Sequence, residues 1–323
     1  MIDGLLVLTL LSVAAVLSCF RFAGCILPAY SVGGDDPLPE PPLDYGLAIL
    51  ADDPVAYWRL GEVIGTVPGK PAKDEKGAHD GTYTVAKFVA APQSQSPGTE
   101  DPPILLTGQP GLVDTALPRT SVRVNGGYVS VDYSAALNPD PNQDPNANQG
   151  FSVEAWVHPE WSDSEGDSFR CVVSSREDTG TTRHGYILYA GPPSLDPAQQ
   201  DGKMYWQAWV GDGTANWVTL VGPEAIAQTT YLLLTYDGGT QTLTLDAFNG
   251  ATNQDNYMQS VRPNTAFSPN PGKPLYIGMG ANEIVPPGTP LYPFLGSLQE
   301  VAFYDKALTK DQAVKHLLAG GGL

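Results

Sequence analysis

Residues 204–210 carry three aromatic side chains, and the alternation of a strand would divide these residues between two faces. One face carries Tyr205, Gln207 and Trp209, and the other carries Met204, Trp206, Ala208 and Val210. One of these faces must join the core. The other can offer aromatic rings against which sugars stack, or it can be covered by a loop.

Two further tryptophans, Trp217 and Trp161, are looser candidates for the same ligand surface. The predicted ligand-binding residues are therefore Tyr205, Trp209, Trp217 and Trp161. For each of them, packing in the core is the alternative role.

The cysteines and histidines show no catalytic or metal-binding spacing. Cys19 and Cys25 fall near the N-terminus, and Cys171 stands alone in a predicted strand, where a buried structural thiol is expected. The four histidines show no recognisable spacing for activating a nucleophile.

The chain is strongly acidic, with 35 acidic and 17 basic residues and a formal net charge of −18. This field repels phosphate backbones and anionic lipid headgroups, so nucleic-acid binding is excluded. An acidic excess favours solubility, and on loops it also suits a divalent cation such as calcium.

Residues 1–27 are predicted to be a hydrophobic export or anchor segment, because an apolar run from Gly4 to Phe20 ends at Arg21. Three fates remain open: cleavage as a secretory signal, lipidation at Cys19 or Cys25, and retention as a membrane anchor. Each predicts an extracellular or cell-surface protein that contacts the membrane only through this segment. Residues 28–46 follow as a proline-rich acidic linker, typical of a stiff tether.

Residues 47–323 are predicted to form one all-β domain, since short apolar or alternating runs are separated by turn residues. One helix is expected at the C-terminus, where Thr309 and Gln312 form a capping box and Gly320 follows as the C′ residue. The predicted strands are 56–60, 81–85, 128–131, 151–157, 171–175, 185–189, 204–210, 217–221, 230–236, 242–248, 275–277 and 296–304. Long polar loops are predicted at 91–103, 138–150, 161–167 and 191–202.

Four segments, in order, carry a family resemblance: 54–62, 74–83, 151–157 and 294–308. The stretch from residue 47 to residue 320 resembles the laminin G-like jelly-roll domains, of bacterial type, in the concanavalin A-like lectin/glucanase superfamily. The resemblance implies a two-sheet antiparallel jelly-roll β-sandwich with a short C-terminal helix, here preceded by the N-terminal hydrophobic segment.

The resemblance also implies a structural calcium ion. In such domains the acidic end of the first strand, the following Asp-Gly loop and an acidic pair in the closing strand come together around the ion. The corresponding residues here are Glu62, Asp74, Gly77, Gln299 and Glu300. Gln299 replaces a carboxylate of the family pattern, although its amide oxygen can still be a ligand.

Glucanases of this superfamily carry paired carboxylates on one strand, commonly as Glu-x-Asp-x-x-Glu. Here residues 151–157 contain only Glu154, and residues 242–248 contain only Asp246. The prediction is therefore a non-catalytic, surface-anchored recognition module that binds glycan or a surface protein. The alternatives are a structural subunit that associates with itself and a divergent glycan hydrolase with an unrecognised acid pair, for which Glu154 and Asp246 are candidates.

Overall fold

A computed structural model gives the fold of this protein and describes residues 44–63, 65, 68–85, 103–113, 119–141, 150–161, 169–194, 199, 201–249, 257–281 and 290–321. These residues belong to one compact unit, Pro41–Leu323. The predicted hydrophobic segment at 1–27, most of the linker at 28–46 and most of the long loops lie outside the described residues. Among the described residues, no helix is both long and apolar enough to cross a membrane.

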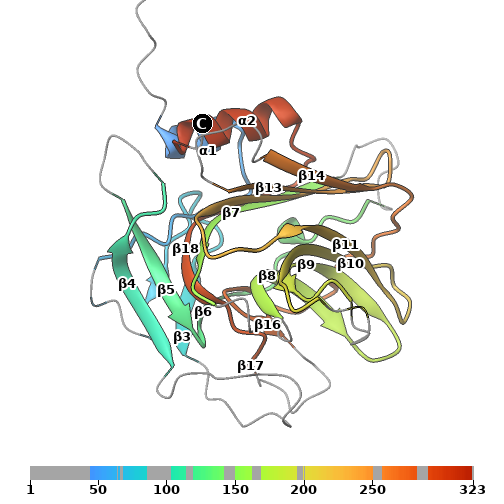
Figure 1. Ribbon diagram of the computed structural model, residues 1–323, viewed down its shortest axis with the longest axis horizontal. Helices are drawn as coiled ribbons and strands as arrows, with labels where there is room; N and C mark the ends of the chain where they lie inside the picture. The colour runs from blue at the N-terminus through green and yellow to red at the C-terminus, as the bar shows by residue number, and fades with distance from the viewer. Residues whose placement is uncertain are drawn as a thin grey trace, which may run out of the picture. The chain divides into compact units, whose positions relative to one another are not determined.

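Two antiparallel sheets form a sandwich, which confirms the predicted fold class (Figure 1). Sheet A has the order β14 (Tyr257–Arg262), β13 (Thr242–Asn249), β12 (Thr230–Asp237), β7 (Phe151–Pro159), β18 (Leu295–Tyr304), β5 (Thr120–Asn125) and β4 (Ile104–Pro110), and β1 (Ala56–Trp58) pairs with β18. Sheet B has the order β11 (Trp217–Glu224), β10 (Tyr205–Gly211), β9 (Arg183–Gly191), β8 (Arg170–Asp178), β15 (Leu275–Ile277), β6 (Gly127–Val131), β3 (Gly81–Val85) and β2 (Pro71–Ala72). A separate pair joins β16 (Gly280–Ala281) to β17 (Pro290–Leu291).

The inner faces of the two sheets enclose the main hydrophobic core. Phe151 of β7 is buried in it, with its ring centroid 4.8 Å from that of Tyr186 on the opposite sheet and 6.2 Å from that of Phe303. Val153, Ala155 and Val157 extend the same inward row because side chains alternate along a strand. The apolar half of the alternation in residues 151–157 is thus explained by this core.

All twelve predicted strands are present, with ends that shift by a few residues. The sequence analysis missed β2, β4, β5, β14, β16 and β17. β4 was hidden because its pairing with β5 shifts register between Leu106 and Gln109, around Gly108 at φ +69°. A bulge with an added glycine breaks the alternation by which a strand is recognised.

Two helices pack on the outer face of sheet A, where Figure 1 shows them together above β13 and β7. α2 (Lys310–Ala319) is the predicted C-terminal helix, and the Thr309–Gln312 capping box is confirmed. Gly320 was expected in the left-handed C′ position. It instead serves as the C-cap at φ −84°, and its N–H bonds to the last turn.

The other helix, α1 (Tyr45–Ala51), corrects the prediction of one helix and shows that helical structure starts before residue 47. Its N-cap is Asp44, whose carboxylate accepts a hydrogen bond from the N–H of Leu47 at 3.1 Å. At 7 residues it is too short to show a clear period in the sequence. It is stabilised by burial of Tyr45, Ala48 and Ile49 against sheet A.

A buried polar cluster fastens both helices to sheet A. Glu154 on β7 is fully buried and accepts hydrogen bonds from the hydroxyls of Tyr231 and Tyr304. The ring nitrogens of His316 lie 3.1 Å from a Glu154 oxygen and 2.9 Å from an Asp52 oxygen. Because both nitrogens face carboxylates, the imidazolium form satisfies both contacts, and one side chain on α2 bridges β7 to the end of α1.

Charge explains why this histidine favours protonation. Burial lowers the pKa of His316, but the adjacent Glu154 and Asp52 carboxylates outweigh it and raise the pKa above its ordinary value. At Asp52 burial raises the pKa, whereas hydrogen bonds from Gln312 and His316 lower it, with a net lowering. The charged forms of both side chains are therefore stabilised in the folded state.

Replacing Glu154 with leucine is expected to destabilise the domain by about 3–5 kcal/mol, because Tyr231, Tyr304 and His316 lose a buried acceptor. Urea denaturation measures this change. Asp53→Asn is the control, since Asp53 pairs with Lys76 at the surface and its replacement should leave stability nearly unchanged. Equal stability of the two variants would contradict a structural role for the cluster.

Stability is also expected to fall as pH rises above neutrality. A raised folded pKa of His316 contributes stability below the unfolded value of about 6.5, and that contribution is lost as pH rises through the folded pKa. The melting temperature measured from about pH 6 to pH 9 should fall more for the parent than for His316→Gln. Parallel curves for the two proteins would show that the imidazolium contributes nothing.

Candidate functional site

The structure decides which face of β10 is core. Trp206, Ala208 and Val210 are buried between the two sheets. By alternation, Gln207 and Trp209 project from the outer face of sheet B. The question that the sequence left open is thereby resolved in favour of an outward-facing Trp209.

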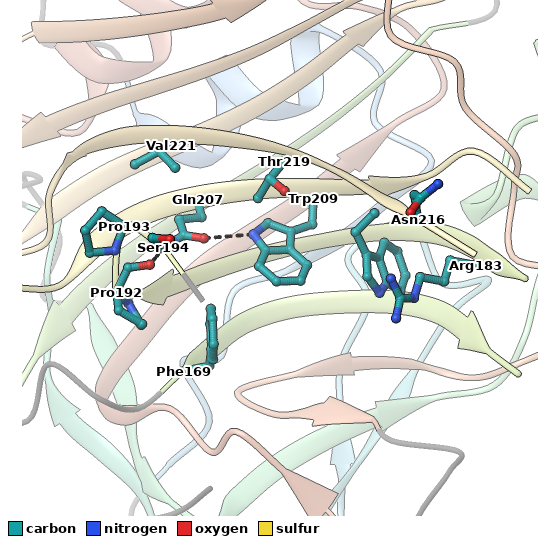
Figure 2. Close-up of a pocket in the computed structure, with 11 residues that line it drawn as sticks. Phe169, Arg183, Pro192, Pro193, Ser194, Gln207, Trp209, Asn216, Thr219 and Val221 are labelled. Carbon is teal, nitrogen blue, oxygen red and sulfur yellow. Dashed lines mark hydrogen bonds between the residues drawn. The ribbon is translucent and has the colours of Figure 1, made fainter. Parts of the chain in front are cut away.

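A pocket of about 380 Å³ lies on this outer face of β9–β11. The strand register builds it, since Gln207 lies opposite Val221 and Trp209 lies opposite Thr219 on β11. Figure 2 shows Pro192, Pro193 and Ser194 at one end of the pocket, Arg183 and Asn216 at the other, and Trp209 between them. The described lining residues are Phe169, Arg183, Pro192, Pro193, Ser194, Gln207, Trp209, Asn216, Trp217, Thr219 and Val221.

Trp209 is held in one orientation at the middle of the pocket. Its indole N–H donates to the side-chain oxygen of Gln207 at 2.8 Å, and the Gln207 amide donates to the carbonyl of Pro192 at 2.6 Å (Figure 2). Phe169 and Tyr189 make edge contacts with the indole, at centroid distances of 5.5 and 5.7 Å. The half-buried ring is thus a preorganised platform.

Trp217 forms a second aromatic surface beside it. The two indole centroids are 6.3 Å apart, and the planes are inclined by 47°. The guanidinium carbons of Arg176 and Arg183 lie 5.6 and 5.9 Å from the Trp217 centroid, in cation–π range. The Nε of Arg183 also donates to Asp178 at 3.2 Å. The Arg183 guanidinium therefore contacts both Trp217 and Asp178 at this end of the pocket.

Two of the four predicted aromatic residues, Trp209 and Trp217, line this pocket. Trp161 was predicted to face a ligand, but only 4% of it is exposed. It packs in the core against Trp206 and Phe294, and its indole N–H donates to the carbonyl of Ala225 at 3.2 Å. That prediction is wrong because an indole with its N–H satisfied internally can pack between the sheets.

Tyr205 is half-buried on β10 and is not among the described lining residues of the pocket. Its hydroxyl donates to Asp201 at 2.6 Å. The sequence pattern did not reveal the pocket residues Arg183, Asn216 and Ser194, because an isolated polar residue near a strand end has no distinctive pattern.

Cys171 is buried, as expected, and burial raises the pKa of its thiol, which makes it a poor nucleophile.

The residues predicted to hold calcium lie around β1, but their oxygens already accept hydrogen bonds from the protein. The Asp74 carboxylate accepts from the backbone N–H groups of Tyr57, Lys76, Ala78 and His79 at 2.8–3.0 Å. Glu62 accepts from the N–H of Lys73 at 3.0 Å and from the Tyr83 hydroxyl. Gly77 has φ +80° in the turn after Asp74, so its role there is conformational.

Gln299 and Glu300 of β18, the other predicted calcium ligands, also form hydrogen bonds within the protein. Gln299 accepts from the N–H of Leu112 at 2.6 Å and donates to Glu300 at 3.1 Å. Glu300 lies at φ +54° in a bulge of β18 and accepts from the Tyr57 hydroxyl and from Arg119. Burial raises the pKa of Glu300, and the contacts with Tyr57 and Arg119 offset this only in part.

These side chains do not fit a calcium site, which needs six to eight oxygens directed at one point. Within the described ranges, no group of three or more His, Cys, Asp or Glu residues is arranged to hold a metal ion. The carboxylates instead order the loop after β2 and anchor the Tyr57 side chain.

The two carboxylates of the hydrolase alternative are inaccessible. In the register of sheet A, Glu154 and Asp246 flank Leu233 on neighbouring strands. Glu154 is fully buried, while Asp246 is 4% exposed and accepts a hydrogen bond from Gln259 at 2.8 Å. Neither can contact a sugar in this structure.

Comparison with known proteins adds a family match. A laminin G family model, described as the concanavalin A-like lectin/glucanases superfamily, matches residues 128–313, which include all three strands of the pocket. No curated protein sequence matches the chain.

Solved structures of similar fold come from several organisms. One is the CBM40 module of a Ruminococcus gnavus IT-sialidase bound to α2,3-sialyllactose, with 16% identity, a TM-score of 0.39, and coverage of 58% of this chain and 95% of that one. A heptameric SAP-like pentraxin from Limulus polyphemus has 13% identity, a TM-score of 0.35, and coverage of 53% and 68%. The binding domain of Botulinum neurotoxin serotype D has 9% identity, a TM-score of 0.45, and coverage of 85% and 52%.

Calcium is expected to leave the melting temperature of the full chain unchanged after chelation and readdition. A ligand raises stability only if the folded state binds it, and the predicted oxygen donors are already engaged. Differential scanning calorimetry with and without calcium measures the effect. An upward shift that disappears in Glu62→Gln would instead support the calcium site implied by the family resemblance.

Proposed function

The chain belongs to the concanavalin A-like lectin/glucanases superfamily, and from this premise we propose that it is a recognition module that binds glycans without cleaving them. The proposed site is the pocket on the outer face of β9, β10 and β11. The expected ligand is an oligosaccharide at a cell or particle surface.

The single observation that carries this proposal is the fixed platform of Trp209. A pyranose ring has an apolar face of C–H groups that can lie against an indole, while its hydroxyls need polar partners at the edge. Trp209 supplies the indole surface, and Ser194, Asn216 and Thr219 line the same pocket with polar side chains. A volume of about 380 Å³ accommodates a small ligand.

Two observations support binding without catalysis. Glycoside hydrolysis generally uses a pair of carboxyl groups beside the scissile bond. The described lining of the pocket contains neither Asp nor Glu. The Glu154 carboxylate is buried on the helix-covered side of sheet A and serves the structural cluster.

We further propose that the domain is displayed outside the cytoplasm on a membrane or lipid anchor. The support is in the sequence: the apolar run from Gly4 to Phe20 resembles an export or anchor segment, and the proline-rich residues 28–46 suit a tether. Such a tether would hold the pocket away from the anchoring surface.

Replacing Trp209 or Trp217 with alanine is expected to weaken glycan binding by about 30-fold or more, because each removes a stacking surface. A glycan array of neutral and acidic oligosaccharides identifies the ligand for the full chain, and calorimetric titration measures its affinity. Tyr128→Ala is the matched control, since Tyr128 is a half-buried aromatic residue on β6 of the same sheet, outside the pocket.

A blank array obtained with folded protein would contradict the glycan proposal. Light scattering on the same sample would then test the structural alternative, which predicts concentration-dependent self-assembly. Unchanged affinity in both tryptophan variants would place the glycan site elsewhere on the protein.

A further inference from the structure

We propose that the pocket selects glycans that carry an acidic sugar residue, and that Arg183 binds the carboxylate or sulfate group of that sugar. This inference rests on the proposed function and names the ligand class of the same site. The charge of the described pocket lining differs in sign from that of the whole chain. The whole chain has 35 acidic and 17 basic residues, yet the described pocket lining contains one charged residue, and that residue is a cation.

Arg183 is held in place from both its backbone and its side chain. Its N–H donates to the carbonyl of Thr214 at 2.7 Å, and its own carbonyl accepts from the N–H of Gly213 at 2.9 Å. The side chain is fixed by the Nε bond to Asp178 and by the cation–π contact with Trp217. A guanidinium fixed in this way loses little conformational entropy when it binds a ligand.

The terminal nitrogens of Arg183 are the groups that can bind a ligand. In the described part of the chain its hydrogen bond to Asp178 uses Nε, and a guanidinium has four more N–H donors on its two Nη atoms. The side chain is 30% exposed. Figure 2 places it beside Asn216 at one end of the pocket. Two parallel N–H donors match the two oxygens of a carboxylate, or two oxygens of a sulfate.

A second guanidinium group lies near Arg183. Arg176 on β8 brings a second guanidinium to Trp217, at 5.6 Å from the ring centroid. Asp178 is the carboxylate paired with Arg183, and the neighbouring Glu177 pairs with Lys273 at 3.6 Å. Both guanidinium groups and the Asp178 carboxylate therefore lie close to Trp217.

The overall charge of −18 makes a local cation necessary for such a ligand. The chain as a whole repels an anionic glycan, but in physiological salt that repulsion is screened beyond about 8 Å. A direct contact inside the pocket is not weakened to the same degree, because it is partly shielded from water. The sugar ring would lie on Trp209 or Trp217 while its acidic group reaches Arg183.

The test compares matched oligosaccharides that differ in one terminal residue: a neutral sugar, a carboxylated sugar or a sulfated sugar. Binding of the full chain is measured by calorimetric titration at fixed ionic strength. The acidic ligands are expected to bind about tenfold or more tightly than the neutral one, as charge-assisted hydrogen bonds imply. This comparison needs no variant and so does not depend on whether a mutant folds.

Arg183→Gln should abolish the preference for the acidic ligands over the neutral one, since it removes the charge-specific contact. Arg183→Lys should recover little of the loss for the carboxylated ligand, because lysine lacks the paired donors. Lys203→Gln is the matched control: Lys203, just before β10, pairs with Glu224 at the end of β11 at 2.7 Å but does not line the described pocket. It should leave all three affinities unchanged.

Each outcome decides the inference. If both acidic ligands bind more tightly than the neutral one and Arg183→Gln loses this preference, the inference is supported and charge is the cause. If only the carboxylated ligand is preferred, the inference is also supported, and the cause is the paired contact of the planar guanidinium with the planar carboxylate. Equal binding of neutral and acidic ligands in the parent overturns it and leaves the proposed glycan function standing. Failure to bind any of the three ligands or any array glycan overturns both.

Discussion

Burial of Trp206 between the two sheets is the constraint on which the proposed site depends. With that indole in the core, the alternation of β10 forces Gln207 and Trp209 to the outer face of sheet B. A slip of one residue would move Trp209 into the core and turn Trp206 outward. The hydrogen-bonded pairing of β10 with both β9 and β11 prevents such a slip and lines up Trp209 with Thr219 and Ile187.

The outer faces of the two sheets differ in what covers them: helices lie on sheet A, whereas aromatic side chains such as Phe169 and Tyr292 pack over part of sheet B. On sheet A, α1 and α2 cover the face, and the Glu154–His316–Asp52 cluster joins them to β7. Among the described residues, Glu154 accepts hydrogen bonds from Tyr231 and Tyr304, and His316 contacts both Glu154 and Asp52, so this cluster satisfies its own polar groups as a low-dielectric site requires. On sheet B the strands β9–β11 keep a pocket in which rings and hydrogen-bonding groups remain partly exposed.

The same tryptophan-rich face illustrates how local and overall electrostatics can differ. Arg176 and Arg183 gather at Trp217, whereas the chain as a whole is strongly acidic. Asp178 balances part of this charge and also orients Arg183. Solubility and repulsion follow from the sum of all charges, but selectivity at short range follows from the few groups that a ligand touches.

The sequence by itself determined most of the strands and the C-terminal helix, because period-two alternation, turn residues and the Thr309–Gln312 capping box are local signals. The resemblance to laminin G-like domains implied how the strands assemble into a sandwich. The sequence also predicted Tyr205, Trp209, Trp217 and Trp161 as ligand-binding residues, of which Trp209 and Trp217 line the pocket. Only the tertiary structure decided that Trp161 is core, that α1 exists, that Asp74 and Glu300 serve protein donors, and that Arg183 joins the aromatic pair. Those outcomes depend on contacts between residues far apart in the chain, and a local pattern carries no information about which distant partner a side chain will meet.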